Sequence, residues 1–137
     1  MAKTVYVATG ALIDRDGRVL LAQRPDDKSY AGLWEFPGGK VKTNERPGTA
    51  LTRELKEELG IDTDQSCFAP FGFATDDLED IHILILLFLC RKWTGTPTAL
   101  EQQTLKWVDP ETLHTYPMPP PDRPLAAQLR DLLCFNA

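Results

Sequence analysis

Three glutamates on one predicted helix are the residues of this chain best suited to chemistry. Glu54, Glu57 and Glu58 are three and four positions apart, so on a helix they fall on one arc. Like charges at such spacings repel one another, and the repulsion grows beside the edge of a core. A divalent cation relieves it, because Mg²⁺ takes hard oxygen ligands and bridges to substrate phosphates. The pattern therefore predicts a magnesium site, with a solvated glutamate-rich helix as the alternative.

The helix that carries these glutamates is predicted over residues 47–59. Pro47 suits a first helical turn, and Gly60 suits a left-handed C-terminal cap. Leu51, Leu55 and Leu59 fall on an arc beside the glutamates and are predicted to face the core.

Basic residues on this helix, and two glycines ahead of it, are the other residues expected to lie near or away from the glutamates. Lys56 points away from the glutamate arc, whereas Arg53 lies at its edge next to Glu57. Just ahead of the helix, Gly38 and Gly39 have no side chains, so their backbone can approach the site closely.

The remaining elements are predicted from apolar and β-branched runs separated by turn signals. Strands are predicted at residues 4–13, 18–24, 34–36, 68–75, 81–93 and 104–108. Asp16-Gly17 predicts a hairpin between the first two strands, and residues 76–80 are predicted to form a solvated loop. A helical turn is predicted at 110–113 and an amphipathic helix at 124–133. This order predicts an α/β (α+β) fold, with an α/β/α sandwich as its layered form.

Composition and charge narrow the class of protein. A chain of 137 residues with 42% hydrophobic and 26% charged residues predicts one domain, residues 1–137, with one core. A formal net charge of −5 argues against duplex nucleic acid as a partner. The longest apolar run, 81–90, is too short to cross a membrane, and no signal-peptide pattern is seen. Three widely spaced cysteines predict reduced thiols, and hence a cytoplasmic protein.

The region between residues 38 and 61 resembles a known family motif. Gly39 is followed after five residues by Glu45, and after seven more by the run Arg53-Glu54-Leu55-Lys56-Glu57-Glu58-Leu59-Gly60-Ile61. This pattern resembles the Nudix box of Nudix hydrolases. The resemblance implies the Nudix fold, an α/β/α sandwich with a mixed central sheet. It also implies Mg²⁺, for which Mn²⁺ can substitute, and a substrate with a nucleoside diphosphate linked to another group.

The same resemblance implies a role for each residue of the box. Glu57 and Glu58 are implied to bind metal, and Glu54 to be a metal ligand and, in some members, the catalytic base. Glu45 and Arg53 are implied to support catalysis by pairing, which orients the loop and the helix.

Two further contributions to the metal site are expected outside the glutamate helix. A backbone carbonyl of Gly38 or Gly39 is expected to complete the site. Glu101 resembles the additional metal ligand that MutT-type enzymes supply from a loop, and the alternative is an ordinary surface glutamate.

The stretches 20–25 and 32–41 resemble MutT-type nucleoside triphosphate pyrophosphohydrolases more narrowly. Arg24 matches a position that binds substrate phosphate there, for which the fork of an arginine is well suited. The alternative is a surface arginine that ends a strand. Phe36 is expected either to line the base pocket or to pack in the core.

Asp122 lies in a segment, 118–125, that resembles the part of MutT-type enzymes that closes the base pocket. The best-known bacterial members have asparagine there, so the preferred base is open. An ionised aspartate only accepts hydrogen bonds, as the amine of cytosine requires, whereas a protonated one also donates. The N7–H and O6 of an oxidised guanine require both a donor and an acceptor. Asp122 is equally well placed to cap the last helix.

The leading hypothesis is a MutT-type enzyme, monomer or homodimer, that converts 8-oxo-dGTP to the monophosphate and pyrophosphate. Such an activity cleanses the nucleotide pool. One alternative is a pyrophosphohydrolase of CTP or modified dCTP. A second, of another class, is a nucleotide-binding regulatory module without turnover. A sugar-nucleotide or dinucleoside-polyphosphate hydrolase is a third, for which 137 residues leave little room.

Overall fold

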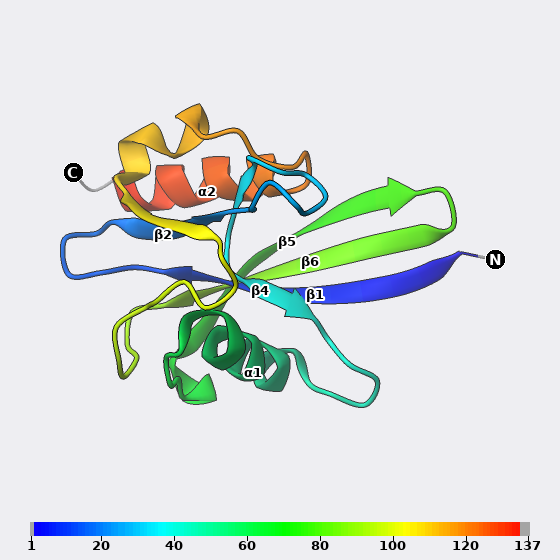
Figure 1. The fold of residues 1–137 in the computed structure, drawn as a ribbon, viewed down its shortest axis with the longest axis horizontal. Coiled ribbons are helices and arrows are strands. Elements are labelled where there is room, and N and C mark those ends of the chain that lie inside the picture. Colours follow the sequence, from blue (N-terminus) through cyan, green and yellow to red (C-terminus); the bar gives the residue numbers. More distant parts are fainter. Residues whose placement is uncertain (1, 135–137) are drawn as a thin grey trace.

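The computed structural model describes residues 2–134 and shows three layers. Helix α1 (Pro47–Leu59) lies on one side of the β-layer and helix α2 (Asp122–Cys134) on the other (Figure 1). The expected α/β/α arrangement is therefore confirmed. Neither helix is long and apolar enough to span a membrane, within the residues that the structure describes.

The larger of two sheets is mixed, as expected, and has the strand order β4-β1-β6-β5. Its strands are β1 (Lys3–Leu12), β4 (Gly38–Lys40), β5 (Phe68–Leu78) and β6 (Ile81–Cys90). Strand β1 is parallel to β6, whereas β4 and β5 are antiparallel to their neighbours. Pairing with β1 fixes β4, a strand that the sequence did not predict, and so places Gly38 and Gly39 beside the central strand.

The smaller sheet is antiparallel, with the order β3-β2-β7. Its strands are β2 (Val19–Gln23), β3 (Trp34–Glu35) and β7 (Thr104–Val108). A 3-10 helix, η1 (Gln65–Cys67), precedes β5, and a second, η2 (Pro110–Thr115), occupies the predicted helical turn before α2.

The predicted hairpin between the first two strands is wrong beyond its turn. The turn forms, with Gly17 at φ 78° and its N–H bonded to the carbonyl of Asp14 at 3.0 Å. One bridge, Ile13 to Val19, joins the strands before β1 and β2 enter different sheets. Strand β1 is central, and since β4 and β6 occupy both its edges, β2 has no edge to pair with.

The predicted loop at 76–80 is also wrong, because β5 continues to Leu78. Asp76 pairs with Ile83 and Asp77 with His82, so only the turn at residues 79–80 interrupts the two strands. Strand β5 is an edge strand, and acidic side chains stay exposed there without breaking the backbone ladder.

Two apolar clusters fill the spaces between the layers. The leucines of α1 pack with Leu12 and Leu20 in one cluster, and residues of α2, including Leu125 and Leu129, form the other. The α1 leucines are fully buried, which confirms the face predicted for them.

Candidate active site

Helix α1 begins and ends where the sequence predicts. Pro47 occupies the first turn, and Gly60 adopts a left-handed conformation at φ 71°, with its N–H bonded to the carbonyl of Lys56 at 3.0 Å. The buried leucine face anchors the helix against the sheet. The glutamates on the neighbouring arc are thereby held at the edge of the β-layer.

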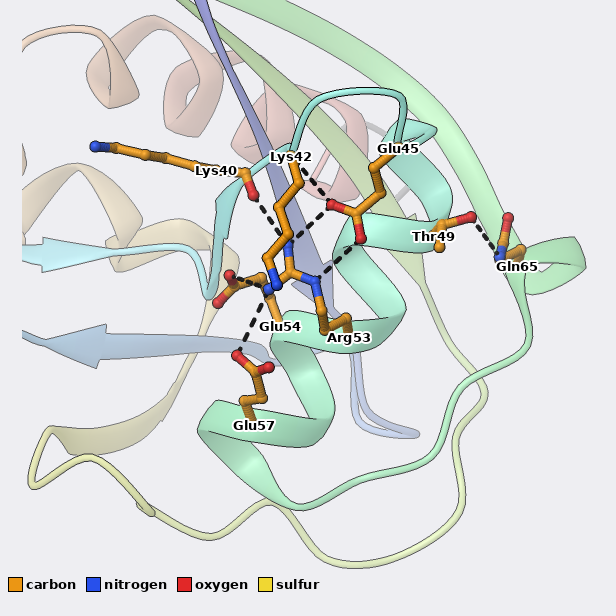
Figure 2. Close-up of polar contacts among 8 residues, drawn as sticks. All are labelled: Lys40, Lys42, Glu45, Thr49, Arg53, Glu54, Glu57 and Gln65. Carbon is orange, nitrogen blue, oxygen red and sulfur yellow. Dashed lines mark hydrogen bonds and ion pairs between the residues drawn. The ribbon is translucent and has the colours of Figure 1, made fainter.

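The guanidinium of Arg53 joins several of the box residues (Figure 2). Its Nε and Nη2 each donate to Glu45 at 3.0 Å, so the pairing expected of these two residues is present. Nη1 donates to Glu54 at 2.8 Å and lies 3.6 Å from Glu57, and Nη2 also donates to the carbonyl of Lys40 at 3.1 Å. One side chain therefore ties the loop, strand β4 and the helix together.

Glu45 is held as an anion by its hydrogen bonds. The guanidinium of Arg53 and then the backbone N–H of Lys42 lower the pKa of Glu45 to about 2. Lys56 turns away from the site and pairs with Asp62 at 3.0 Å, as the helical spacing predicts. Arg53 is thus the basic residue of α1 that neutralises the glutamate face.

Glu58 lies in the interior of the site. Its Oε2 accepts a hydrogen bond from the N–H of Gly38 at 3.0 Å. Burial, and then the neighbouring Glu54 and Glu101, raise the pKa of Glu58 to about 8. A side chain at Gly38, which has φ 150°, would overlap the backbone of Ala8. Only glycine permits this close approach between β4, β1 and the carboxylate.

Gly39 makes the second close approach. A Cβ atom at this position would overlap the carboxylate of Glu54. Pairing of Gly39 with Ala8 of β1 fixes the backbone at that distance. The expectation that the two glycines bring the backbone against the glutamates is confirmed.

A cleft of about 510 Å³ opens beside Glu58. It is lined by Ala22, Gln23, Arg24, Pro25, Asp27, Lys28, Glu35, Pro37, Glu58, Leu100, Glu101, Gln102 and Gln103. Glu101 lines the same cleft as Glu58, and its charge, after burial and Glu54, contributes to the raised pKa of Glu58.

Of the expected substrate residues, Arg24 lines the cleft and Phe36 does not. The Nη1 of Arg24 donates to both carboxylate oxygens of Glu35, at 3.0 and 3.2 Å, and its Nε donates to the carbonyl of Ser29 at 2.7 Å. Phe36 is 3% exposed and packs in the core cluster on the α2 side. Of the two interpretations of Phe36, core packing is therefore the one the structure shows.

Asp122 is buried, with 8% of its surface exposed, and it is the first residue of α2. Within residues 2–134 its carboxylate accepts no hydrogen bond, so the interpretation as a helix cap is wrong. Burial, and then the charge of Glu35, raise the pKa of Asp122 to about 7. Asp122 thus lies near a residue of the cleft wall, although it does not line the cleft itself.

Among the cleft residues that the sequence analysis did not single out, Glu35 and Gln103 bond directly to residues that it did. Glu35 lines the cleft, whereas the residue that follows β3, Phe36, packs in the core, and this alternation was the available signal. Burial raises the pKa of Glu35, an effect that Arg24 opposes. Gln103 bonds to the backbone of Glu58 at 3.2 Å, a contact that no local pattern reveals.

The oxygen atoms that the site offers are suitable ligands for a hard divalent cation. Glu54, Glu57 and Glu58 with the carbonyls of β4 supply only oxygen ligands, as Mg²⁺ prefers. Burial, and then the charges of Glu54 and Glu101, raise the pKa of Glu58, and a cation beside it would favour its ionised form. Within residues 2–134 no three acidic, histidine or cysteine side chains lie close enough together to bind a metal ion as they stand. Glu54 is hydrogen-bonded to Arg53.

Comparison with known proteins shows the family to which the chain belongs. A family model described as NUDIX domain matches residues 8–128. The chain belongs to the Nudix family, as the box and the fold indicate.

Relatives and solved structures narrow the class within this family. A CTP pyrophosphohydrolase of Escherichia coli K12 is 44% identical over 115 residues, covering 84% of each chain. An 8-oxo-dGTP diphosphatase of the same organism is 33% identical over 130 residues, covering 95% of this chain and 99% of that one. The solution structure of the E. coli ORF135 protein has a TM-score of 0.84 at 37% identity, covering 96% and 91%. A structure from a study of MutT of Aliivibrio salmonicida and Vibrio cholerae has a TM-score of 0.80 at 30% identity, covering 95% of this chain and 99% of that one. The protein is thus a nucleotide pyrophosphohydrolase of the MutT type.

Proposed function

We propose that the protein is a Mg²⁺-dependent pyrophosphohydrolase that converts a nucleoside triphosphate to the monophosphate and pyrophosphate. The observation that carries the proposal is the glutamate face of α1, organised by Arg53, at the wall of a cleft of about 510 Å³. Such a cleft has the size of a small-molecule site. Mn²⁺ is expected to substitute for Mg²⁺.

Each residue of the site has a proposed task. Glu57, Glu58 and Glu54 would hold the metal with the carbonyls of Gly38 or Gly39, and Glu101 would join them from its loop. A bound divalent cation neutralises phosphate oxygens and lowers the pKa of an attacking water. Glu54 has one carboxylate oxygen that Arg53 does not hold, and this oxygen would serve either as a metal ligand or as the base for the attacking water.

Two other residues support this chemistry from the sides. Arg53, held by Glu45, fixes the orientation of Glu54 and the loop before α1. Arg24 projects from the end of β2 into the cleft and would bind a substrate phosphate with the part of its guanidinium that Glu35 leaves open.

The leading candidate substrate is 8-oxo-dGTP. With a pKa near 7, Asp122 is largely protonated at slightly acidic pH and partly protonated at neutral pH. A protonated carboxyl donates to O6 and accepts from N7–H of an oxidised guanine, as the asparagine of MutT-type enzymes does. Two relatives named 8-oxo-dGTP diphosphatase, at 42% and 33% identity, support this choice.

A second candidate, CTP or a modified dCTP, is favoured by a separate observation. The relative named CTP pyrophosphohydrolase is 44% identical to this chain. A carboxylate at Asp122 would accept from the exocyclic amine of cytosine. Both candidates would use the same proposed metal site and cleavage position, and they differ in the base and, for CTP, also in the 2′-hydroxyl of the sugar.

A substrate panel with Mg²⁺ tests the proposal. We expect hydrolysis of 8-oxo-dGTP to the monophosphate and pyrophosphate, abolished by a chelator and restored by Mg²⁺. A kcat/KM for dCTP-type substrates more than tenfold above that for 8-oxo-dGTP would move the assignment to cytosine. Nucleotide binding without any turnover would instead indicate a regulatory module.

Glu57→Gln tests the metal site itself. Because it removes a proposed ligand while keeping the shape of the side chain, the rate should fall by several orders of magnitude. Glu79→Gln, in the turn between β5 and β6, is the matched control and should leave the rate unchanged. An unchanged rate in Glu57→Gln would refute the site assignment.

A further inference from the structure

The loop that carries Glu101 is fastened to the last turn of α1. The N–H of Leu100 donates to the carbonyl of Glu58 at 3.0 Å, and the N–H of Thr98 donates to that of Leu59 at 2.9 Å. Within the loop, Gln102 has a φ of 62°, a left-handed conformation that residues other than glycine seldom adopt. Such a conformation persists where neighbouring contacts impose it.

The side chain of Gln103 supplies such contacts. Its Oε1 accepts a hydrogen bond from the N–H of Glu101 at 2.9 Å, and its Nε2 donates to the carbonyl of Glu58 at 3.2 Å. A single amide group therefore connects the backbone of two residues whose side chains line the same cleft. Its own backbone leads directly into β7, which begins at Thr104 and is fixed by pairing with β2.

The side chain of Glu101 has no such restraint. It is exposed, and within residues 2–134 its carboxylate makes no hydrogen bond or ion pair. The position of its backbone, which Gln103 holds, therefore decides which groups this side chain can reach.

We propose that Gln103 is a positioning residue that holds Glu101 against Glu58, and so acts on metal binding through Glu101. The inference rests on the proposed function, since it requires Glu101 to be a metal ligand. Residues that orient metal ligands contribute about 10- to 100-fold in metal affinity or activity. Because Gln103 also lines the cleft, direct contact with the substrate is the competing explanation that the experiment must separate.

Gln103→Met removes both hydrogen bonds while nearly keeping the length and volume of the side chain. We expect the affinity for Mn²⁺, measured by electron paramagnetic resonance of the free ion without nucleotide, to fall about 10-fold or more. We expect kcat to fall with it. Gln65→Met is the matched control, because Gln65 also bonds to α1, through Thr49 at 3.1 Å near the start of the helix (Figure 2), and does not line the cleft. It should change neither quantity.

A double-mutant cycle with Glu101→Gln decides how Gln103 acts. If Gln103 works through Glu101, adding Gln103→Met to Glu101→Gln produces little further loss of Mn²⁺ affinity or kcat. If the losses of the two single variants multiply fully in the double variant, the proposal is overturned. Gln103 would then act through the substrate or through stability, and not through Glu101. Wild-type behaviour of Gln103→Met beside an impaired Glu101→Gln would overturn this inference and leave the proposed function intact. An unimpaired Glu101→Gln would refute both Glu101 as a ligand and the task of Gln103.

Hydrogen exchange in the unaltered protein tests the same contact without a substitution. The N–H of Glu101 should be protected by its bond to Gln103, and Mg²⁺ should increase that protection. Exchange at the rate of a free amide, with or without Mg²⁺, would overturn the proposal even if the Gln103 variant failed to fold.

Discussion

The buried carboxyl of Asp122 should make the stability of this protein fall as the pH rises. Its ordinary pKa is 3.8, and burial followed by the charge of Glu35 raises it to about 7 in the folded protein. The folded state therefore keeps a proton that the unfolded chain releases. Below about pH 4 both states are protonated and stability is complete, and between about pH 4 and pH 7 stability is progressively lost.

The size of this loss follows from the shift in pKa. A difference of about 3 pKa units, at about 1.4 kcal/mol each, corresponds to about 4 kcal/mol once the pH exceeds 7. Local opening that admits water to the carboxylate reduces this value, so we expect about 2–4 kcal/mol. Asp122→Asn removes the ionisation and should be more stable than the wild type by this amount at pH 8, but not at pH 4.

Urea unfolding of both proteins across pH 4–8.5 is the appropriate assay. The raised pKa of Glu58 also makes stability depend on pH. This contribution is present in both proteins, so it cancels when their free energies of unfolding are compared at the same pH. Asp131→Asn, an exposed position on the same helix, is the control and should show no such trend. A difference between Asp122→Asn and wild type that is constant across the range would refute the reasoning, because Asp122 would then ionise normally when folded.

Three further substitutions test the site and its support. Gly39→Ala should lower kcat/KM by about 100-fold, because the added Cβ displaces the carboxylate of Glu54; unchanged kinetics would contradict the close approach. Arg53→Lys keeps the charge but loses the fork that grips Glu45, so Mn²⁺ affinity should fall by about 10- to 100-fold in a binding titration, unless charge alone is sufficient. Leu55→Ala should cost about 2–5 kcal/mol of stability in urea unfolding, since the side chain is fully buried, and a loss below about 1 kcal/mol would show that the core refills the cavity.

Features that depend on neighbouring residues were predictable from the sequence. Helix α1 has the predicted bounds because Pro47 and Gly60 act locally on its two ends. The pairing of Arg53 with Glu45 follows once that helix and the loop before it are in place. The site was therefore best predicted where it is most local.

Features that depend on distant partners were not predictable in the same way. An Asp-Gly turn indicates a hairpin, but it does not reveal that β4 and β6 occupy both edges of β1. The capping interpretation of Asp122 failed because α2 begins before Pro124, where the sequence predicted its start. Asp122 is itself the first residue of the helix. Gln103 was missed because its partner, Glu58, is remote in the sequence and is contacted through its backbone.

The parallel pairing of β1 with β6 has a consequence for how the chain folds. Lys3 pairs with Ile81 and Leu12 with Cys90, so β1 has no long partner until β6 is made, with α1 and β5 between them in the chain. Non-local pairing of this kind slows folding, because a long loop must close before its contacts form. Since β4 reaches the glutamates by pairing with β1, the backbone part of the proposed metal site depends on a strand whose long partner, β6, is made late. A nascent chain that stops before β6 should therefore contain β1, β4 and the glutamate helix, but its pairing of β1 with β4 should be less stable than in the finished sheet.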